Sequence, residues 1–310
     1  MSSGVRSHTV PQADRVAVTL PRLQEMKENG EPIVMVTAYD YPSATVAEAA
    51  GVDLVLVGDS AANVVLGYDR TDLVSMEEMI VLGKAVRRGL RTPLMIGDMP
   101  MGSYEASDEL AVTMAQRLIK ETGCQAVKLE AGGVSVQRAR AIVAAGIPVM
   151  GHLGLTPQTA TALGGYKAQG KSARAAIQMH EDAVALERAG CFAVVFEAVP
   201  AEIATTIAER LEIVTIGIGA GPATSGQVLV FHDLLGITTG HMAKFVKQYG
   251  DVHASMVEAV GRYADEVRGG SFPGPEHVYA IDEEELADFR RHVDDRALAS
   301  AKAWEWEPLS

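Results

Sequence analysis

The sequence predicts an α/β protein with the (β/α)8 TIM-barrel fold, and two features of its pattern carry this prediction. Short apolar or β-branched runs of strand length recur along the 310 residues, and segments with helical periodicity separate them. The runs begin at Ile33, Asp53, Pro93, Gln125, Ile147, Cys191, Glu212 and Gln227. Eight alternating units of this kind fit a closed barrel better than an open doubly wound sheet.

The other elements follow from local signals along the chain. Residues 1–18 are polar and are expected to form a disordered N-terminal extension, and residues 20–29 are expected to form a short helix that ends at Gly30. The barrel is expected to fill residues 19–280 as one catalytic domain, which a chain of this length allows. The charged residues 281–310 are expected to form a helical tail.

Glycines mark the ends of the helical segments between the strands. Each of these segments stops at a glycine just before the next apolar run, where a left-handed C-cap lets the chain turn back. The glycines in question are Gly51, Gly89, Gly123, Gly146 and Gly190.

Composition excludes several classes of function. With 40 acidic and 27 basic residues and a net charge of -13, the chain lacks the basic surplus of a phosphate-backbone binder, so no nucleic-acid partner is expected. Residues 1–17 have no apolar signal core, and no apolar run approaches the length of a membrane span. Cys124 and Cys191 each begin an apolar strand and suit a reducing compartment. We therefore expect a soluble, cytoplasmic protein with no membrane partner.

Several of the strand-like runs end on an ionisable residue. In a parallel barrel the carboxyl ends of all strands lie at one rim, so these side chains are expected to converge on one site. The residues are Asp59, Asp98, Glu130, His152 and Glu197. Neighbouring carboxylates repel one another unless a cation holds them together. The sequence therefore indicates an enzyme.

Asp59, Asp98 and Glu130 end consecutive strands and are the candidate metal ligands. Oxygen ligands without a nearby cysteine favour a hard cation, and an incomplete carboxylate set leaves coordination places for water and substrate, as Mg²⁺ prefers. The alternative is that each acid caps the helix after it or is solvated in a loop.

Lys128 lies two residues before Glu130, so both side chains are expected to face the barrel axis. A lysine at that position needs an anionic partner, which is either Glu130 or a substrate carboxylate. The alternative is a salt bridge with no further role.

Three more residues are candidates for the chemistry. Glu197 is expected to face the metal ligands from across the mouth, where a free carboxylate can act as a general base. His152 is expected to orient a substrate oxygen, or else to cap a loop. Ser60 follows Asp59 and is expected either to donate a hydrogen bond to the substrate or to cap a helix or turn.

Two other motifs are expected to be structural. The glycines of GIGAG, Gly217, Gly219 and Gly221, lack the spacing of a dinucleotide fingerprint and indicate a tight turn or an anion-facing loop. His232 and Asp233 close the last strand and either reach the site or pack in the core.

A set of longer motifs carries a resemblance to a known family. They are MVTAYDYPSA (35–44), VGDSAANVVLGYDRT (57–71), GDMP (97–100), VKLEAG (127–132), GHLGLTPQ (151–158), GGYKAQG (164–170), FEAVP (196–200) and GIGAGPATSGQVLVFHDLLG (217–236). From about residue 20 to 277 the chain resembles the ketopantoate hydroxymethyltransferases, also called 3-methyl-2-oxobutanoate hydroxymethyltransferases. The N-terminal extension and the tail are longer than the family needs.

The resemblance implies a barrel of the phosphoenolpyruvate/pyruvate type, dependence on Mg²⁺ and a homo-oligomer, a decamer of two pentameric rings. It implies metal contacts from Asp59, Asp98 and Glu130. It also implies substrate contacts from Asp59, Ser60, Asp98 and Lys128, with Glu197 as the proton acceptor.

The implied reaction belongs to pantothenate and coenzyme A biosynthesis. A Mg²⁺-stabilised enolate of 3-methyl-2-oxobutanoate would attack the one-carbon unit of 5,10-methylenetetrahydrofolate and give 2-dehydropantoate. Two rivals stay open at this point. One is a related barrel enzyme that makes or breaks carbon-carbon or carbon-phosphorus bonds in 2-oxo acids without folate, and the other is a non-catalytic scaffold.

Overall fold

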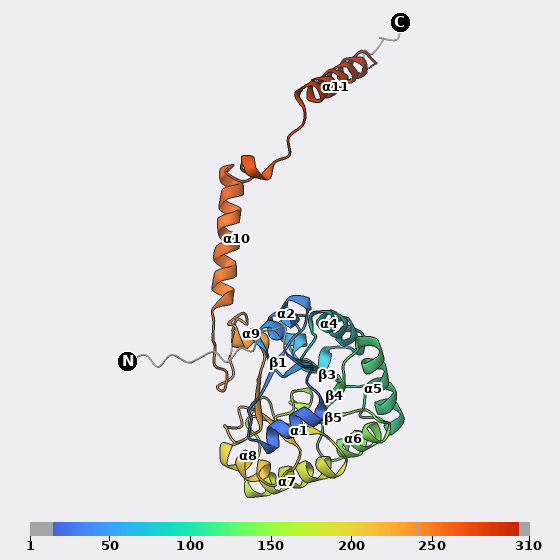
Figure 1. The fold of residues 1–310 in the computed structure, drawn as a ribbon, viewed down its shortest axis with the longest axis vertical. Helices are drawn as coiled ribbons and strands as arrows, with labels where there is room; N and C mark the ends of the chain where they lie inside the picture. The colour runs from blue at the N-terminus through green and yellow to red at the C-terminus, as the bar shows by residue number, and fades with distance from the viewer. Residues whose placement is uncertain (1–14, 241, 304–310) are drawn as a thin grey trace, which may run out of the picture. The chain divides into compact units, whose positions relative to one another are not determined.

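The computed structural model describes residues 15–240 and 242–303. Within these residues, eight parallel strands close a barrel in chain order, and β8 pairs with β1 (Figure 1). The strands are β1 (Ile33–Thr37), β2 (Leu54–Val57), β3 (Leu94–Asp98), β4 (Ala126–Glu130), β5 (Val149–Gly154), β6 (Ala193–Glu197), β7 (Val214–Ile218) and β8 (Gly226–Leu229). The predicted barrel fold and its strands are confirmed.

Helices connect consecutive strands from β1 to β7 and surround the barrel (Figure 1). They are α2 (Tyr41–Ala50), α4 (Met76–Gly89), α5 (Asp108–Thr122), α6 (Ser135–Ala144), α7 (Ala173–Arg188) and α8 (Ala201–Ala208), with α1 (Leu20–Glu28) before β1. Shorter turns are α3 (Ala61–Val64), η2 (Thr71–Leu73), η3 (Pro157–Thr159) and α9 (Phe231–Leu234). By contrast, residues 219–225 connect β7 to β8 without a helix.

Strands β2 to β7 are buried on both faces because alternate side chains point to the barrel axis and to the helices, whereas Val34 of β1 and Gln227 of β8 are exposed. One cluster fills the interior and includes Met35, Leu54, Leu56, Leu94, Ile96, Met150, Val195 and Ile216. The other packs between strands and helices and includes Val55, Met95, Val127, Val149 and Val194. Asp98, Lys128 and Glu130 have the spacing of the interior cluster, so the strand pattern itself turns them toward the axis.

Four of the five glycines predicted to end helices have left-handed backbone angles. Gly51 and Gly123 are left-handed C-caps of α2 and α5, and Gly146 and Gly190 also have positive φ angles, as predicted. The prediction for Gly89 is wrong. It is the last residue of α4, and a Cβ there would lie 2.7 Å from the Cβ of Ala44, so close packing against α2 requires the glycine.

The chain divides into a barrel unit up to His253 and a second unit from Ala254 onward. The second unit contains most of α10 (Val252–Gly269), then η4 (Pro275–His277) and α11 (Glu283–Ala303). The proposed division at residues 18 and 280 stays a prediction, and most of the N-terminal extension lies outside the described residues. Among the described helices, none has the length and apolarity needed to cross a membrane.

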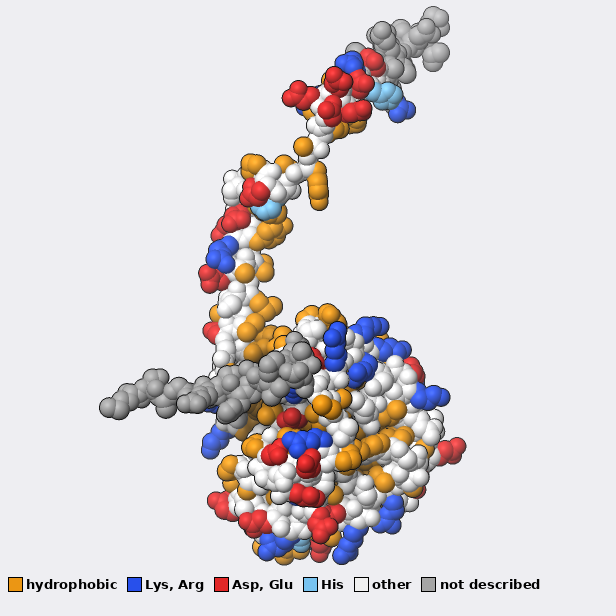
Figure 2. All heavy atoms as spheres, viewed as in Figure 1, with side chains coloured by type: hydrophobic (Ala, Val, Ile, Leu, Met, Phe, Trp, Pro, Cys, Tyr) orange, Lys and Arg blue, Asp and Glu red, His pale blue; other side chains and the backbone are white. Residues whose placement is uncertain are grey.

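Apolar side chains lie exposed along one face of α10, where the ring of Tyr263 packs against that of Phe272. Met256, Val260, Tyr263 and Val267 recur at helical spacing and are each about half exposed or more. Figure 2 shows this line of hydrophobic side chains along the helix. An exposed apolar stripe of this length is typical of an interaction surface.

Candidate active site

Ionisable side chains gather at the carboxyl ends of β3 to β6. Asp98, Glu130 and Glu197 are the last residues of their strands, and His152 lies near the end of β5. The strand register places Lys128 beside Asp98, and Glu130 beside His152. Because all of these groups except Glu197 are at least 95% buried, each needs a polar or charged partner.

Lys128 and Asp98 form an ion pair across β4 and β3. The Lys128 Nζ is 2.8 Å from Oδ1 of Asp98, so its partner within the chain is Asp98 and not Glu130, one of the two partners expected. Burial lowers the pKa of Lys128, but the nearby carboxylates, led by Asp98, outweigh burial and raise this pKa above its ordinary value. Burial raises the pKa of Asp98 to about 7, although Lys128 opposes that shift. Lys128 is therefore a permanent positive charge at the site.

His152 lies between two carboxyl groups. Its Nδ1 is 3.9 Å from Oε1 of Glu130, and its Nε2 is 3.3 Å from Oε2 of Glu197. Burial and the charge of Lys128 lower the pKa of His152, so the ring is neutral. The Lys128 ammonium can only donate and lies 3.4 Å from Nδ1, which places the ring proton on Nε2, facing Glu197.

Asp59 and Ser60 come from the loop after β2 rather than from the strand itself. The strand ends at Val57, and the backbone N–H of Asp59 donates to Oδ2 of Asp98 at 3.1 Å. Ser60 stands at the start of α3, yet its hydroxyl makes no capping bond. That hydroxyl instead lies 2.8 Å from the phenol oxygen of Tyr39, which is fully buried. The alternative that Ser60 is a helix cap is therefore wrong.

The three acids Asp59, Asp98 and Glu130 influence one another electrostatically. Burial first, and then the charge of Asp59, raise the pKa of Glu130 well above its ordinary value. When ionised, the three carboxylates carry three negative charges against the single positive charge of Lys128. That leaves two charges for a divalent cation to neutralise.

The donor set fits a hard divalent cation in chemistry, although it is not gathered around a single point. Oε2 of Glu130 is buried and has no hydrogen-bond partner, so it is free to act as a ligand. Among the described residues, no three His, Cys, Asp or Glu side chains are grouped closely enough to hold a metal ion. A bound cation would therefore need to draw these side chains together.

Sequence reasoning missed two residues at this site. Gln158 and Tyr104 are both buried, and the Gln158 amide bonds to Asp59 while the Tyr104 hydroxyl bonds to Gln158. Gln158 belongs to the motif GHLGLTPQ, in which the sequence pattern singles out only His152 as a site residue. The signal that could have found it is a polar residue directly after the proline that starts η3, close to a strand end.

The two motifs expected to be structural make structural contacts. Gly219 and Gly221 have positive φ angles in the turn between β7 and β8. The His232 ring packs against the ring of Tyr39, with centroids 5.4 Å apart, and the Asp233 carboxylate accepts a hydrogen bond from Thr238.

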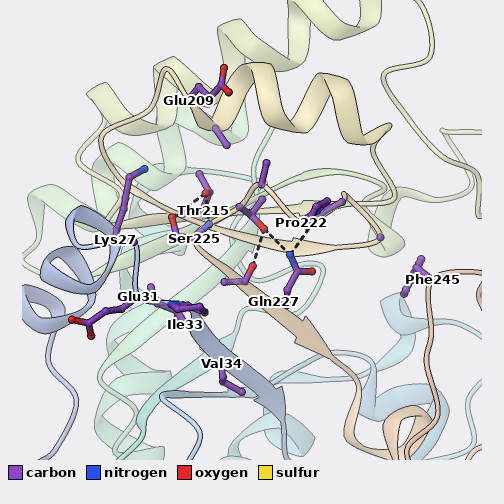
Figure 3. A pocket seen from close by; sticks show the side chains of 18 residues that line it. Lys27, Glu31, Ile33, Val34, Glu209, Thr215, Pro222, Ser225, Gln227 and Phe245 are labelled. Atoms are coloured by element: carbon purple, nitrogen blue, oxygen red, sulfur yellow. Dashed lines mark hydrogen bonds between the residues drawn. The ribbon is translucent and has the colours of Figure 1, made fainter. Parts of the chain in front are cut away.

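A separate cavity of about 880 Å³ lies beside the helix-free connection from β7 to β8 (Figure 3). Ile33 and Val34 of β1, Gln227 of β8 and Phe245 line it, and Gln227 donates to Thr224 across the turn at 2.9 Å. Among the described residues that form this cavity there is no predicted site residue. Its lining carries three charged residues, Lys27, Glu31 and Glu209. The barrel mouth instead gathers buried acids with a lysine and a histidine, so the mouth is the better candidate active site.

A closed parallel barrel with acids and a lysine at its carboxyl rim defines a TIM barrel whose candidate active site lies at that rim. Solved structures of this shape include a phosphonopyruvate hydrolase, with a TM-score of 0.55 at 13% identity, covering 94% of this chain and all of the other. A 2,3-dimethylmalate lyase, itself described as a member of the PEP mutase/isocitrate lyase superfamily, has a TM-score of 0.51 at 16% identity, over 93% and 99% of the two chains. These similarities concern the fold.

The family follows from the sequence itself. The ketopantoate hydroxymethyltransferase model matches residues 17–275, and the chain belongs to that family. The 3-methyl-2-oxobutanoate hydroxymethyltransferase of Moorella thermoacetica is 55% identical over 267 residues, 86% of this chain and 99% of the relative. That of Heliobacterium modesticaldum is 52% identical, over 86% and 97%. A mitochondrial relative from Arabidopsis thaliana is 48% identical, over 95% and 88%.

Proposed function

We propose that this chain transfers a hydroxymethyl group from 5,10-methylenetetrahydrofolate to 3-methyl-2-oxobutanoate, giving 2-dehydropantoate and tetrahydrofolate. Family membership supports the reaction. The observation that carries the chemistry is the arrangement at the barrel mouth, where the charged Lys128 and the neutral His152 separate Glu197 from the three buried acids.

Asp59, Asp98 and Glu130 would hold a Mg²⁺ ion, with Oε2 of Glu130 as a free ligand atom. Among the solved structures of this fold, a phosphonopyruvate hydrolase was crystallised with oxalate and Mg²⁺. When bound, the cation supplies Lewis-acid stabilisation of the negative charge that develops on the substrate.

Lys128, Ser60 and His152 bind and orient the 2-oxo acid, together with Asp59 and Asp98. Lys128 supplies the positive charge for the substrate carboxylate, and Ser60 supplies a hydroxyl that Tyr39 holds in place. Fixing the substrate against these groups lowers the entropic cost of forming the carbon-carbon bond.

Glu197 accepts the proton from C3 of the substrate. Its side chain is 16% exposed, compared with 1–5% for Asp98, Lys128, Glu130 and His152, so it is the most accessible carboxylate of this set. The Nε2–H of His152 faces its Oε2 at 3.3 Å and orients the carboxylate without neutralising it. A carboxylate that is accessible, oriented and not paired with a cation suits a general base.

The test is proton NMR of 3-methyl-2-oxobutanoate in D₂O with the purified protein, with and without Mg²⁺. We expect the C3 proton signal to disappear only when Mg²⁺ is present, and EDTA to stop the exchange. If no divalent metal supports exchange, the same samples are repeated with tetrahydrofolate present, and failure there too would contradict the proposed chemistry.

The variant Glu197→Gln tests whether Glu197 is the general base. Because the amide cannot take the proton, exchange and turnover should fall by about 10²- to 10⁴-fold while the metal and the 2-oxo acid still bind. Glu202→Gln, an exposed position in the first turn of α8, is the matched control and should behave like the unmodified protein. Near-normal turnover in Glu197→Gln would remove Glu197 from this role.

Product analysis with and without the folate separates this function from a folate-independent lyase. The proposal requires that 2-dehydropantoate form only when methylenetetrahydrofolate is supplied. Cleavage of the 2-oxo acid, or a product formed without folate, would favour the rival reaction.

We also infer a homo-oligomer, with the decamer that the family resemblance implies, and a cytoplasmic location. The exposed apolar face of α10 supports an assembly. The free, buried Cys124 and Cys191 suit a reducing compartment.

A further inference from the structure

Gln158 connects the loops and strand ends that carry the candidate metal ligands. Its side-chain Nε2 donates to Oδ2 of Asp59 at 2.9 Å and to the backbone carbonyl of Met99 at 3.1 Å. Its backbone N–H donates to Oε1 of Glu130 at 3.1 Å. One residue from the loop after β5 therefore bonds to two of the three acids and to the residue that follows the third, Asp98.

Tyr104 determines which way the Gln158 amide faces. Its hydroxyl donates to Oε1 of Gln158 at 2.8 Å, and both side chains are at least 96% buried. The Asp59 carboxylate and the Met99 carbonyl are acceptors, so the NH₂ group must face them and the amide oxygen must face the phenol. A flipped amide would set its oxygen against two acceptors, so the observed orientation is the one that satisfies every partner.

Every donor of Gln158 and the hydroxyl of Tyr104 have hydrogen-bond partners at this buried place. Each amide proton of Gln158 has its own acceptor, and the backbone N–H has a third. A leucine of similar size would pack the same space but could not orient a carboxylate. The use of every donor points to orientation of the acids rather than to filling of a gap.

We propose that Gln158, held by Tyr104, is a positioning residue that sets the orientation of Asp59 and Glu130 for the divalent cation, an inference that rests on the proposed function. The neutral amide joins the two acids to fixed partners without adding charge. Partners that orient ligands in this way commonly change metal affinity by about 10- to 100-fold.

Titration with Mn²⁺, followed by the EPR signal of the free ion, tests the proposal on the full-length protein. In Gln158→Leu the dissociation constant for Mn²⁺ should rise by about tenfold or more. Tyr104→Phe removes only the bond that fixes the amide, so its effect should be smaller, about fivefold. In the double variant the two effects should be less than multiplicative, because both changes act on one unit.

Gln178→Leu is the matched control, since Gln178 is an exposed residue of α7 and lies outside the site. It should bind Mn²⁺ like the unmodified protein. A second measurement distinguishes a positioning role of Gln158 from damage to the fold. At saturating Mg²⁺ the hydrogen exchange of 3-methyl-2-oxobutanoate by Gln158→Leu should recover, because Lys128 and Glu197 are unchanged.

The outcomes distinguish failure of the positioning role of Gln158 from failure of the proposed metal-assisted function. If the unmodified protein binds Mn²⁺ and both Gln158→Leu and Tyr104→Phe bind it equally well, the positioning role is wrong and the proposed function stands. Exchange by a folded Gln158→Leu that stays low at saturating Mg²⁺ would also overturn the role. If the unmodified protein binds no divalent ion, the metal-assisted function fails and the inference fails with it.

Discussion

Burial shifts the pKa values of the residues at the barrel mouth in different directions. The alternation of side chains along each strand determines which of these residues face the barrel axis. Asp98 is pushed toward its neutral form and His152 is held neutral, while Lys128 stays charged because acids surround it. All are inward-facing positions on adjacent strands. The mouth therefore holds the positive charge of Lys128, the neutral ring of His152 and acids that could bind a cation.

The raised pKa of Asp98 predicts how stability depends on pH when metal is removed. Its pKa is near 3.8 ordinarily and about 7 in the folded protein. Between these values the unfolded chain loses the proton and the folded chain keeps it, so the contribution of Asp98 to stability falls as pH rises. Relative to Asp98→Asn, the protein in EDTA should therefore lose unfolding free energy as the pH rises from 4 to 7.

Urea unfolding of both proteins across that pH range provides the measurement. Asp265→Asn, at a side chain that is 84% exposed, is the control and should show no such difference. A stability difference between the protein and Asp98→Asn that stays constant with pH would show that Asp98 is not desolvated in solution.

The bond between Tyr39 and Ser60 predicts a change in substrate binding alone. In Tyr39→Phe the hydroxyl of Ser60 loses the partner that holds it, so the KM for 3-methyl-2-oxobutanoate should rise by about two- to tenfold. Binding of Mn²⁺ should not change, because neither residue is a candidate metal ligand. Tyr41→Phe, at an exposed position, is the control, and a loss of metal affinity in Tyr39→Phe would contradict this division of roles.

Among the elements, α2 is attached to the turn before β3 by a single buried carboxylate. Glu48 accepts hydrogen bonds from the backbone N–H groups of Arg91 and Thr92 and from the Thr92 hydroxyl, at 2.7 to 3.0 Å. Burial raises the pKa of Glu48, but these bonds outweigh burial and lower it overall. No local pattern predicts this attachment, because the partners are more than 40 residues apart in the chain.

Glu48→Gln should cost about 1–3 kcal/mol of unfolding free energy at neutral pH, because an amide cannot accept from all of these donors as the carboxylate does. A lowered folded pKa means that this stability is present above the pKa of the unfolded glutamate and is lost as pH falls through the folded value. The difference between the protein and Glu48→Gln should therefore shrink below about pH 4.

Thermal unfolding monitored by circular dichroism from pH 3 to pH 8 would reveal this trend. Glu202→Gln, exposed in α8, serves again as the control. A difference that grows on acidification would mean that Glu48 is not bound as a carboxylate.

At the scale of the whole molecule, the apolar stripe of α10 is exposed in the single chain, and an exposed stripe of this kind suggests contact with another chain. If this face binds a second copy of the chain, a charge at its centre should weaken assembly. We expect Val260→Glu to shift the protein to smaller species in sedimentation velocity. Arg262→Glu, on the opposite face of the helix, should leave assembly unchanged, and equal sedimentation of both variants and the unmodified protein would exclude the stripe as a subunit contact.

The barrel and the inward direction of Asp98, Lys128, Glu130 and Glu197 were predictable from the sequence. Strand alternation is a local property, and residues two apart on a strand must share a face. Closure of eight parallel strands then brings their carboxyl ends to one rim. The same local reasoning could not foresee that Gly89 is a packing position, because its neighbour Ala44 belongs to another helix.

Contacts between segments were decided by strand register and loop closure. The pairing of Lys128 with Asp98, the bond from Tyr39 to Ser60 and the place of Gln158 between two acids all join residues that are far apart in the chain. A local pattern states which way a side chain points, but not which residue of the next strand or loop stands opposite. The sequence alone therefore determines which chemical groups face the site. The folded barrel determines which residues these groups contact and how their pKa values shift.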